Sequence, residues 1–508
     1  MAAFTSSLSA ELAGVGGGWT ALDADVLGSV PISISYGIQG NGPNDRIAST
    51  GTLTFALNNS TTSAGALLGY YSPDNANLRS GWAVGIRVRM TFTFSATTYY
   101  KFIGTLETIE PIPGTRGPRS VLCTVVDWMD DAAKQKTNNI ATQTSKRADE
   151  IISAVVANMT RQPISTSYSA AQLEYPYALD TAEDEATSAM TELAKAVNSD
   201  LGFLYVIGDT SAGGKLVYHD RRVRQAATTS LATLSNTMAG MTVSRSRSRI
   251  YNRVKVSVNP RRVDADATTV LYQYDAAQLL ALGPSESITI YGQYRDPDQR
   301  AQRVGGVDLV TPAATTDYTF GTGPGDTSLT ASLTVTATTG GNSAIIELTN
   351  GAAVTGFVTF LQIRGRGLYD YDAVTLQATD ATSKTAYGEF VLSVDMPHET
   401  RQHVASSVAD VFLADYKDPR TYIDGVSFWA NYSDALMTAA LAREPGDLVT
   451  ITETVTGLST TYFINGVSYE VIGGKQLRAA WVLAPDLETA TVFILDTSTL
   501  NGAHVLGW

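Results

Sequence analysis

Residues 86–94 read Ile86-Arg87-Val88-Arg89-Met90-Thr91-Phe92-Thr93-Phe94. Apolar side chains occupy every second position, and charged or hydroxyl side chains occupy the positions between them. A strict period of two places the two kinds on opposite faces of an extended chain, so the stretch predicts a β-strand with one buried face.

The surrounding sequence has the same texture. Three further segments, 31–36, 51–57 and 120–126, alternate or run apolar with many β-branched residues, and clusters of Gly, Asn and Pro separate them. Several short strands at such spacing are typical of a barrel or a sandwich. Residues 1–135 are therefore predicted to form a first β-domain.

The period changes between residues 136 and 240. Ile151, Ile152, Val155 and Val156 share one face of a predicted helix. A second helix is predicted to begin at an N-cap Thr181, with Glu183, Asp184 and Glu185 in its first turn and a buried stripe through Met190, Leu193, Ala194 and Val197. Segments 201–207 and 215–218 read as a hairpin, which completes a predicted α/β domain.

Strands resume after residue 240, at 244–249 and 254–258, and residues 241–304 and 376–420 are predicted to connect the domains. Residues 305–375 look like an inserted small β module, rich in Thr and Gly, and a helix near 400–417 ends before Pro419. Strands return in 421–508. There Asn465-Gly466 fits either a two-residue hairpin or a bulge in one long strand.

Composition limits the class of protein. The 508 residues are 44% hydrophobic and 17% charged, which indicates a globular chain and excludes a disordered one. The single cysteine, Cys123, excludes internal disulfides and cysteine-based zinc sites. We expect neither a secretory signal nor a membrane anchor, because the first residues lack Lys and Arg and no run approaches about 18 apolar residues.

Charge is distributed unevenly. The chain carries a formal net charge of −13, yet residues 215–262 contain eleven basic residues and one acidic residue, a local charge of +10. The rest of the chain therefore carries −23. This asymmetry favours a charge-matched contact with a particular partner over general nucleic-acid coating.

The sequence shows no catalytic, cofactor-binding or metal-binding constellation. His398 and His403 lack the spacing of a helical zinc pair, and His219 and His504 stand alone. The glycines of 321–325 lack the ending of a phosphate-binding loop and read as a turn, and Cys123 lies in an apolar strand. Asp370 and Asp372 are expected to form ion pairs with Arg364 and Arg366, although a glycosidase pair of acids elsewhere stays open.

Arg245, Arg247 and Arg249 form the sharpest local pattern. A period of two would place all three guanidinium groups on one strand face, which must then meet water, carboxylates or phosphate. Two interpretations follow: a solvated face, or a contact with a subunit interface or a channel lumen.

The order of segments carries further information. A series of motifs follows one another along the chain: Gly18-Trp19-Thr20, Tyr71-Ser72-Pro73, Lys101-Phe102-Ile103-Gly104, Gly202-Phe203-Leu204-Tyr205, Ile363-Arg364-Gly365-Arg366, Pro445-Gly446-Asp447 and Trp481-Val482-Leu483. Taken in this order, the sequence resembles a minor tail protein of a long-tailed (siphovirus-type) bacteriophage, in the baseplate-hub or tail-tip hub family.

The resemblance implies a mainly β fold with α/β parts: two hub-type β-barrels (1–135 and 421–508), an α/β domain between them and the inserted module. It implies a non-enzymatic ring component, a homotrimer with pseudo-sixfold symmetry that connects the tail tube to the tip and adhesion apparatus. Its partners would be the distal tail or tail-tube protein, the tape-measure protein and other tail-tip or fibre proteins, with DNA only in transit. It would be assembled in the host cytoplasm and located at the virion tail tip. The alternative is a tail-associated glycan-binding or cell-wall-hydrolysing protein.

Overall fold

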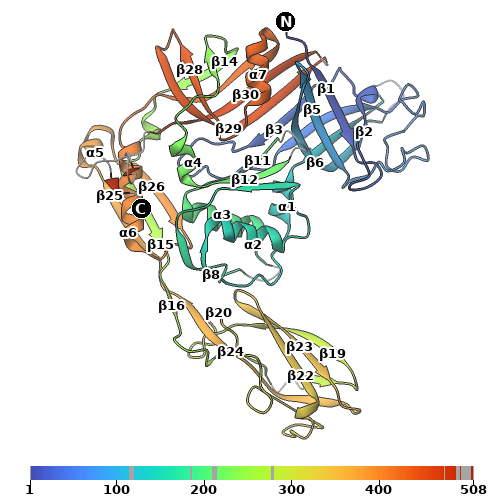
Figure 1. Cartoon of the computed structure of the whole chain (residues 1–508), viewed down its shortest axis with the longest axis vertical. Helices are drawn as coiled ribbons and strands as arrows, with labels where there is room; N and C mark the ends of the chain where they lie inside the picture. The colour runs from blue at the N-terminus through green and yellow to red at the C-terminus, as the bar shows by residue number, and fades with distance from the viewer. Residues whose placement is uncertain are drawn as a thin grey trace.

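The computed structural model describes residues 2–113, 119–182, 186–208, 214–275, 280–473 and 475–487, and the backbone of 492–493 and 505–506. A broad sheet lies at one end, α/β layers lie beneath it, and a β module extends away at the other end (Figure 1). Three separate hydrophobic clusters correspond to these parts. The predicted mainly β class with α/β parts is confirmed.

The largest sheet has 13 strands and takes them from both ends of the chain. The N-terminal strands are β1 (Thr5–Ala10), β2 (Thr20–Ala21), β3 (Ile32–Gly37), β4 (Thr52–Asn58), β5 (Arg87–Phe94), β6 (Thr97–Pro111) and β7 (Ser120–Val126). The others are β13 (Thr233–Ser235), β14 (Gly240–Ser244), β27 (Tyr422–Trp429), β28 (Leu448–Glu453), β29 (Leu458–Ile472) and β30 (Gln476–Pro485), and α7 (Asp434–Ala442) packs on them. The alternating pattern of 86–94 is confirmed, because Val88, Met90 and Phe92 are buried in β5.

The two halves meet where β3 pairs antiparallel with β29, from Gly37↔Gly466 to Ile32↔Val471. The sequence predicted two separate barrels, but the pairing of the described strands runs as one path from β14 to β2 and closes neither half on itself. Asn465-Gly466 is a bulge within β29, where the register with β30 shifts between Ile464 and Gly466. Gly37, at φ +91°, passes so close to this bulge that a Cβ would lie 2.6 Å from the Asn465 carbonyl oxygen.

A buried ion pair ties the halves together beneath this junction. Lys101 of β6 is 2% exposed, and its Nζ lies 2.6 Å from Oε1 of Glu444, which precedes β28. The Tyr36 hydroxyl donates to the other oxygen of Glu444 at 2.8 Å, and the ring of Tyr469 lies 5.4 Å from the ammonium group. Burial alone would lower the pKa of Lys101, but Glu444 and Tyr469 outweigh it and leave the pKa raised.

The α/β part lies under the sheet. It contains α1 (Trp128–Lys134), β8 (Gln143–Arg147), α2 (Ala148–Asn158), β9 (Ser165–Tyr168), β10 (Glu174–Ala178), α3 (Ala189–Asp200), β11 (Phe203–Ile207), β12 (Lys215–His219) and α4 (Arg221–Ala226). A second layer shares its core through β15 (Arg253–Val258), β25 (Val374–Thr379), β26 (Val391–Met396) and α6 (Gln402–Tyr416). The short helix α5 (Ala381–Tyr387) connects β25 to β26. The predicted stripe of α2 is confirmed as buried.

The predicted start of the second helix was wrong. Helix α3 begins at Ala189, and Ser188 is its N-cap, whose hydroxyl accepts from the Thr191 N–H. Leu179 takes a left-handed conformation at φ +63° and turns the chain, so Thr181 belongs to a turn before the helix. Of the predicted stripe, Leu193 and Val197 are buried. Residues 183–185, expected in the first turn, lie outside the described residues.

The β module is larger than predicted. Its strands are β16 (Arg261–Val263), β17 (Thr269–Gln273), β18 (Leu280–Leu282), β19 (Ser287–Gln293), β20 (Gly305–Val307), β21 (Tyr318–Gly321), β22 (Leu333–Thr339), β23 (Ser343–Asn350) and β24 (Gly356–Asp370). The sequence placed its start at 305, but β16, β17 and β18 pair with the long β24, and β19 pairs with β23. Without these earlier strands β24 would lack partners along part of its length.

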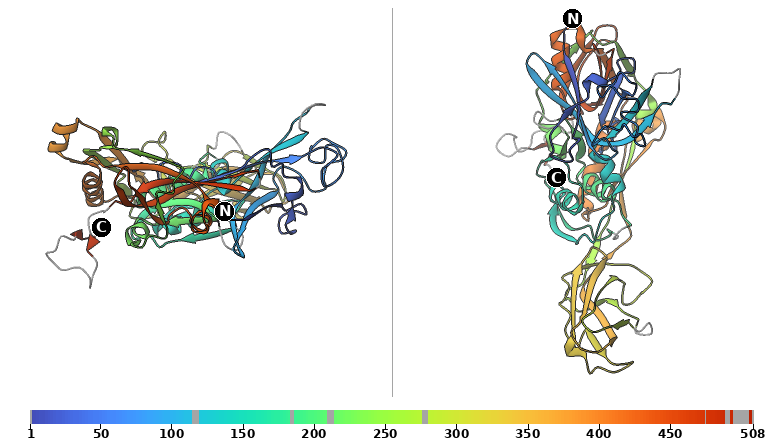
Figure 2. Two further views of the ribbon diagram at one scale, coloured as in Figure 1. Left: turned by 90° about the horizontal axis from the view of Figure 1, so that it is seen from above. Right: turned by 90° about the vertical axis from the view of Figure 1, so that its right-hand side faces the viewer.

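The root of the module is fixed to the α/β part by Arg261. Its Nε lies 2.7 Å from Asp180 and 3.2 Å from Asp370, and Arg261 and Asp180 are both nearly completely buried. Gly341 also touches the α/β part, since a Cβ there would lie 2.1 Å from the Leu179 carbonyl oxygen. The module projects along the long axis of the molecule (Figure 2).

Glu444→Gln should lower the free energy of unfolding by about 3 kcal/mol, because it leaves the Lys101 ammonium buried without its counterion. Glu107→Gln is the matched control: it breaks the exposed Lys134–Glu107 pair and should cost less than about 1 kcal/mol. Urea unfolding of both variants measures the difference. Equal losses in the two variants would contradict the role given to the buried pair.

Candidate assembly interface

The arginine segment does not form a strand. Strand β14 ends at Ser244, and Arg247–Arg249 is a 3₁₀ turn. The Ser246 hydroxyl accepts from the Ser248 N–H at 3.2 Å and so competes with strand pairing. The predicted common face of Arg245, Arg247 and Arg249 is therefore wrong.

Each of the three arginines contacts a different segment: the connection after α6, the connection before β26, and β27. Arg245 donates to the Pro419 carbonyl at 2.9 Å, and the Arg247 guanidinium lies 5.6 Å from the Phe390 ring centre. Arg249 forms an ion pair with Asp424 of β27. The segment thus joins the C-terminal strands to the layer of α6 and β26. Arg245 and Arg247 are exposed, and their contact with a neighbouring subunit or a lumen stays a prediction.

A long connection between β4 and β5, residues 59–86, forms a rigid surface loop. Asp25, 1% exposed, accepts from the Tyr71 hydroxyl at 2.5 Å and from the Ala64 N–H at 2.6 Å. Arg79 donates to the same hydroxyl at 2.7 Å, and the Trp82 ring packs edge-on against Tyr71 at 5.1 Å. Side chains within the loop and Asp25 outside it thus hold the loop in place, and a long ordered loop is usually functional.

The loop presents apolar side chains to solvent. Leu67, Leu68 and Val84 are 42%, 43% and 61% exposed. The sequence analysis did not predict this surface. The long segment of turn-forming residues between two predicted strands could have indicated it. Exposed apolar side chains on a rigid loop favour contact with another protein.

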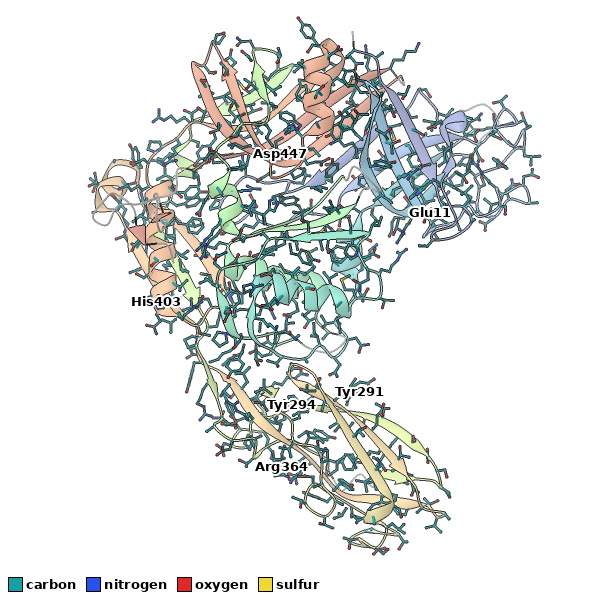
Figure 3. The ribbon with its side chains drawn as sticks, in the orientation of Figure 1. Glu11, Tyr291, Tyr294, Arg364, His403 and Asp447 are labelled. Atoms are coloured by element: carbon teal, nitrogen blue, oxygen red, sulfur yellow. The ribbon has the colours of Figure 1, made fainter. Side chains whose placement is uncertain are left out.

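The histidines do not form a site. His398 is completely buried, and neither ring nitrogen has a hydrogen-bond partner. Burial lowers its pKa to about 3, against the opposing effect of Asp180. Burial also lowers the pKa of His219 to about 4, and its Nδ1 lies 2.7 Å from the Tyr205 hydroxyl. His403 is exposed on α6 (Figure 3), and His504 lies outside the described residues.

The carboxylates pair differently from the prediction. Arg364 contacts Asp317 at 2.6 Å, and Arg366 contacts Asp308 at 3.0 Å. Arg364 and Asp370 both lie in the extended strand β24, where residues six positions apart are about 20 Å apart and cannot meet. Asp372 lies past the end of β24 and is exposed, and it appears in none of the ion pairs found among the described residues. Asp370 instead contacts Arg261.

Two local predictions, the turn at 321–326 and the buried Cys123, are confirmed. The loop at 321–326 is a turn in which Asp326 accepts from the N–H of Thr322 at 2.7 Å, and Cys123 is buried in β7. Across the described ranges there is no group of three metal-binding side chains. Within the same part of the chain, no helix is both long and apolar enough to cross a membrane.

Comparison with solved structures found likenesses that cover nearly the whole chain. The chain is similar to a tail protein from Neisseria meningitidis MC58, at 9% identity and a TM-score of 0.48, covering 96% of this chain and 98% of the other. It is also similar to the prophage MuSo2 43 kDa tail protein from Shewanella oneidensis, at 10% identity and a TM-score of 0.48, covering 95% of this chain and 99% of the other. The third is the prophage tail protein gp18 from Listeria monocytogenes EGD-e, at 9% identity and a TM-score of 0.39, covering 94% of this chain and 94% of the other. No family model and no curated protein sequence matches the chain.

His398→Leu should flatten the acid dependence of stability. With a pKa of about 3 in the folded chain and about 6.5 unfolded, the histidine takes up a proton only on unfolding between these values. The unmodified chain should therefore lose up to about 1.4 kcal/mol of unfolding free energy more than the variant for each pH unit below 6.5. Denaturant unfolding from pH 7 to pH 4 measures this. The exposed control His403→Leu should follow the unmodified chain, and parallel curves for all three would refute the assignment.

Proposed function

We propose that the chain is a structural, non-enzymatic protein of a bacteriophage tail, a tail-tip hub that assembles as a homotrimeric ring. The proposal begins from the order of motifs that resembles the hub family. In that resemblance, each subunit supplies two β-barrels, one from the start and one from the end of the chain. The ring would be part of the virion, assembled in the host cytoplasm.

The observation that carries the proposal is the sheet shared by the two chain ends. Residues 5–126 and 422–485 contribute to one 13-stranded sheet, joined at β3 and β29. A single rigid platform of this breadth suits a ring subunit, because it can contact neighbours at both of its ends. The short strand β2 ends one side of the path, and the rigid loop 59–86 with Leu67 and Leu68 lies on the same N-terminal half.

The proposed partners are those that the resemblance implies. The sheet platform would face the tail-tube or distal tail protein and, through the lumen, the tape-measure protein and transiting DNA. The module, which projects from the opposite end of the body, would point toward other tail-tip or fibre proteins (Figure 2).

The test is the oligomeric state. Native mass spectrometry of the full chain should give a trimer, and Leu67→Ser with Leu68→Ser should reduce the trimer fraction at least tenfold, because the apolar contact is lost. Val455→Ser, at a residue 92% exposed between β28 and β29, is the control and should assemble normally. A chain that stays monomeric at every concentration, or that is absent from purified tails, would refute the proposal.

A second candidate function is glycan binding by the module. A hollow of about 330 Å³ lies beside Tyr291, whose ring is 61% exposed, whereas Tyr294 on the same segment is buried in the module core (Figure 3). The hollow is also lined by Gln273, Gln293 and Arg300, and Arg300 donates to Gln273 at 2.7 Å. An exposed aromatic face beside planar polar groups suits a sugar ring.

Tyr291→Ala should then weaken binding of host cell-wall glycans at least tenfold in a glycan array or pull-down. Tyr371→Ala, at an exposed residue just past β24, should bind as the unmodified chain does. If the unmodified chain retains no glycan, or if both variants lose binding equally, the second candidate fails.

A further inference from the structure

A cavity of about 140 Å³ lies where the α/β part meets the C-terminal strands, away from the interface and the module hollow. Its walls come from β11, α4, α6, β29 and β30, and from the connecting segments 41–46 and 486–487. Phe203, Phe412 and Phe463 supply apolar surface, and Arg224 and Asn465 supply polar groups. A cavity of this size accommodates one branched aliphatic side chain or one aromatic ring.

Arg224 is a buried cation without a counterion. It is 8% exposed, its Nε and Nη2 have no hydrogen-bond partner, and among the described residues no carboxylate forms an ion pair with it. Its guanidinium group stacks on Phe203 at 3.6 Å and lies 5.2 Å from Phe463. An isolated buried charge is costly, so an anion that reaches it gains strongly.

Asn465 supplies an unsatisfied acceptor to the same cavity. It is 1% exposed, and its Nδ2 donates to the Gly40 carbonyl at 2.7 Å, which fixes the orientation of the amide. Its Oδ1 has no partner. A ligand that satisfies both residues must therefore offer an N–H donor to Asn465 and an anionic group to Arg224. The bulge at Asn465-Gly466 is what places this residue at the cavity rather than in regular pairing.

Carboxylates in the lining do not neutralise Arg224. Asp45 accepts from the Gly42 N–H at 2.7 Å, and Asp486 accepts from the Thr461 hydroxyl at 2.8 Å. Burial raises the pKa of the third, Asp415, to about 6. Arg46 and Arg221, which also line the cavity, add two further positive charges.

We propose that this cavity binds the carboxyl-terminal residue of a polypeptide with an apolar side chain. The terminal carboxylate pairs with Arg224, the backbone N–H of that residue donates to Asn465 Oδ1, and the side chain packs among the phenylalanines. The three features of the cavity match the three groups of such a residue. An internal Asp or Glu offers the carboxylate and the N–H but no apolar side chain.

The experiment is calorimetric titration of the full chain with N-acetyl-L-leucine. We expect binding at millimolar or lower concentration, and at least tenfold weaker binding of N-acetyl-L-leucinamide, which lacks the carboxylate, and of 4-methylpentanoate, which lacks the N–H. Binding of the amide as strong as that of the acid would overturn the proposal. So would tighter binding of N-acetyl-L-isoglutamine, whose only carboxylate is a side chain.

Arg224→Met should reduce the affinity for N-acetyl-L-leucine at least tenfold, while Arg222→Met, on the exposed side of α4, should leave it unchanged. Thermal unfolding of the variants checks that they are folded. If Arg224→Met does not fold, the ligand series on the unmodified chain decides by itself. Full affinity in a folded Arg224→Met variant would refute the site, whatever the outcome of the oligomer measurements.

Discussion

The antiparallel pairing of β3 with β29 is the constraint on which the molecule depends. It joins residues more than four hundred positions apart, so the broad sheet cannot exist until both ends of the chain have been made and brought together. Closing so long a loop is entropically costly and makes the contact order high, which predicts slow formation of the sheet. The Lys101–Glu444 pair lies under the same junction, and it is satisfied only when the two halves meet in register.

The basic segment 215–262 shows how charge asymmetry in a sequence is resolved by folding. Arg253 pairs with Glu389, Arg249 with Asp424 and Arg261 with Asp180, so three of the eleven basic side chains of the segment are matched by these carboxylates. Its arginines fasten the module, the C-terminal strands and the α/β part to one another. Arg224 differs from these, because it is buried without such a carboxylate.

The periodicity of the sequence predicted the features that depend on a single segment of the chain. The alternation in 86–94, the helical face through Ile151 and Val155, and the buried Cys123 are all properties of one segment, and each is confirmed. The wrong predictions concern segments whose structure is determined by a nearby side chain or by pairing with a distant strand. Ser246 turns the arginine segment into a 3₁₀ turn, and β24 recruits β16 from outside the predicted module. The Arg224 cavity takes residues from five elements, and no spacing along the sequence brings them together.

The module is attached to the body through two neighbouring strands, which bears on how such a chain can gain or lose it in evolution. The polypeptide enters the module through β16 and leaves through β24, and these strands are paired with Arg261 opposite Asp370. The entry and exit points are therefore about one strand spacing apart, roughly 5 Å. A short turn could bridge that gap without displacing β15 or β25. Residues 262–369 thus constitute a cassette that recombination can remove or exchange in a single event while the platform keeps its shape.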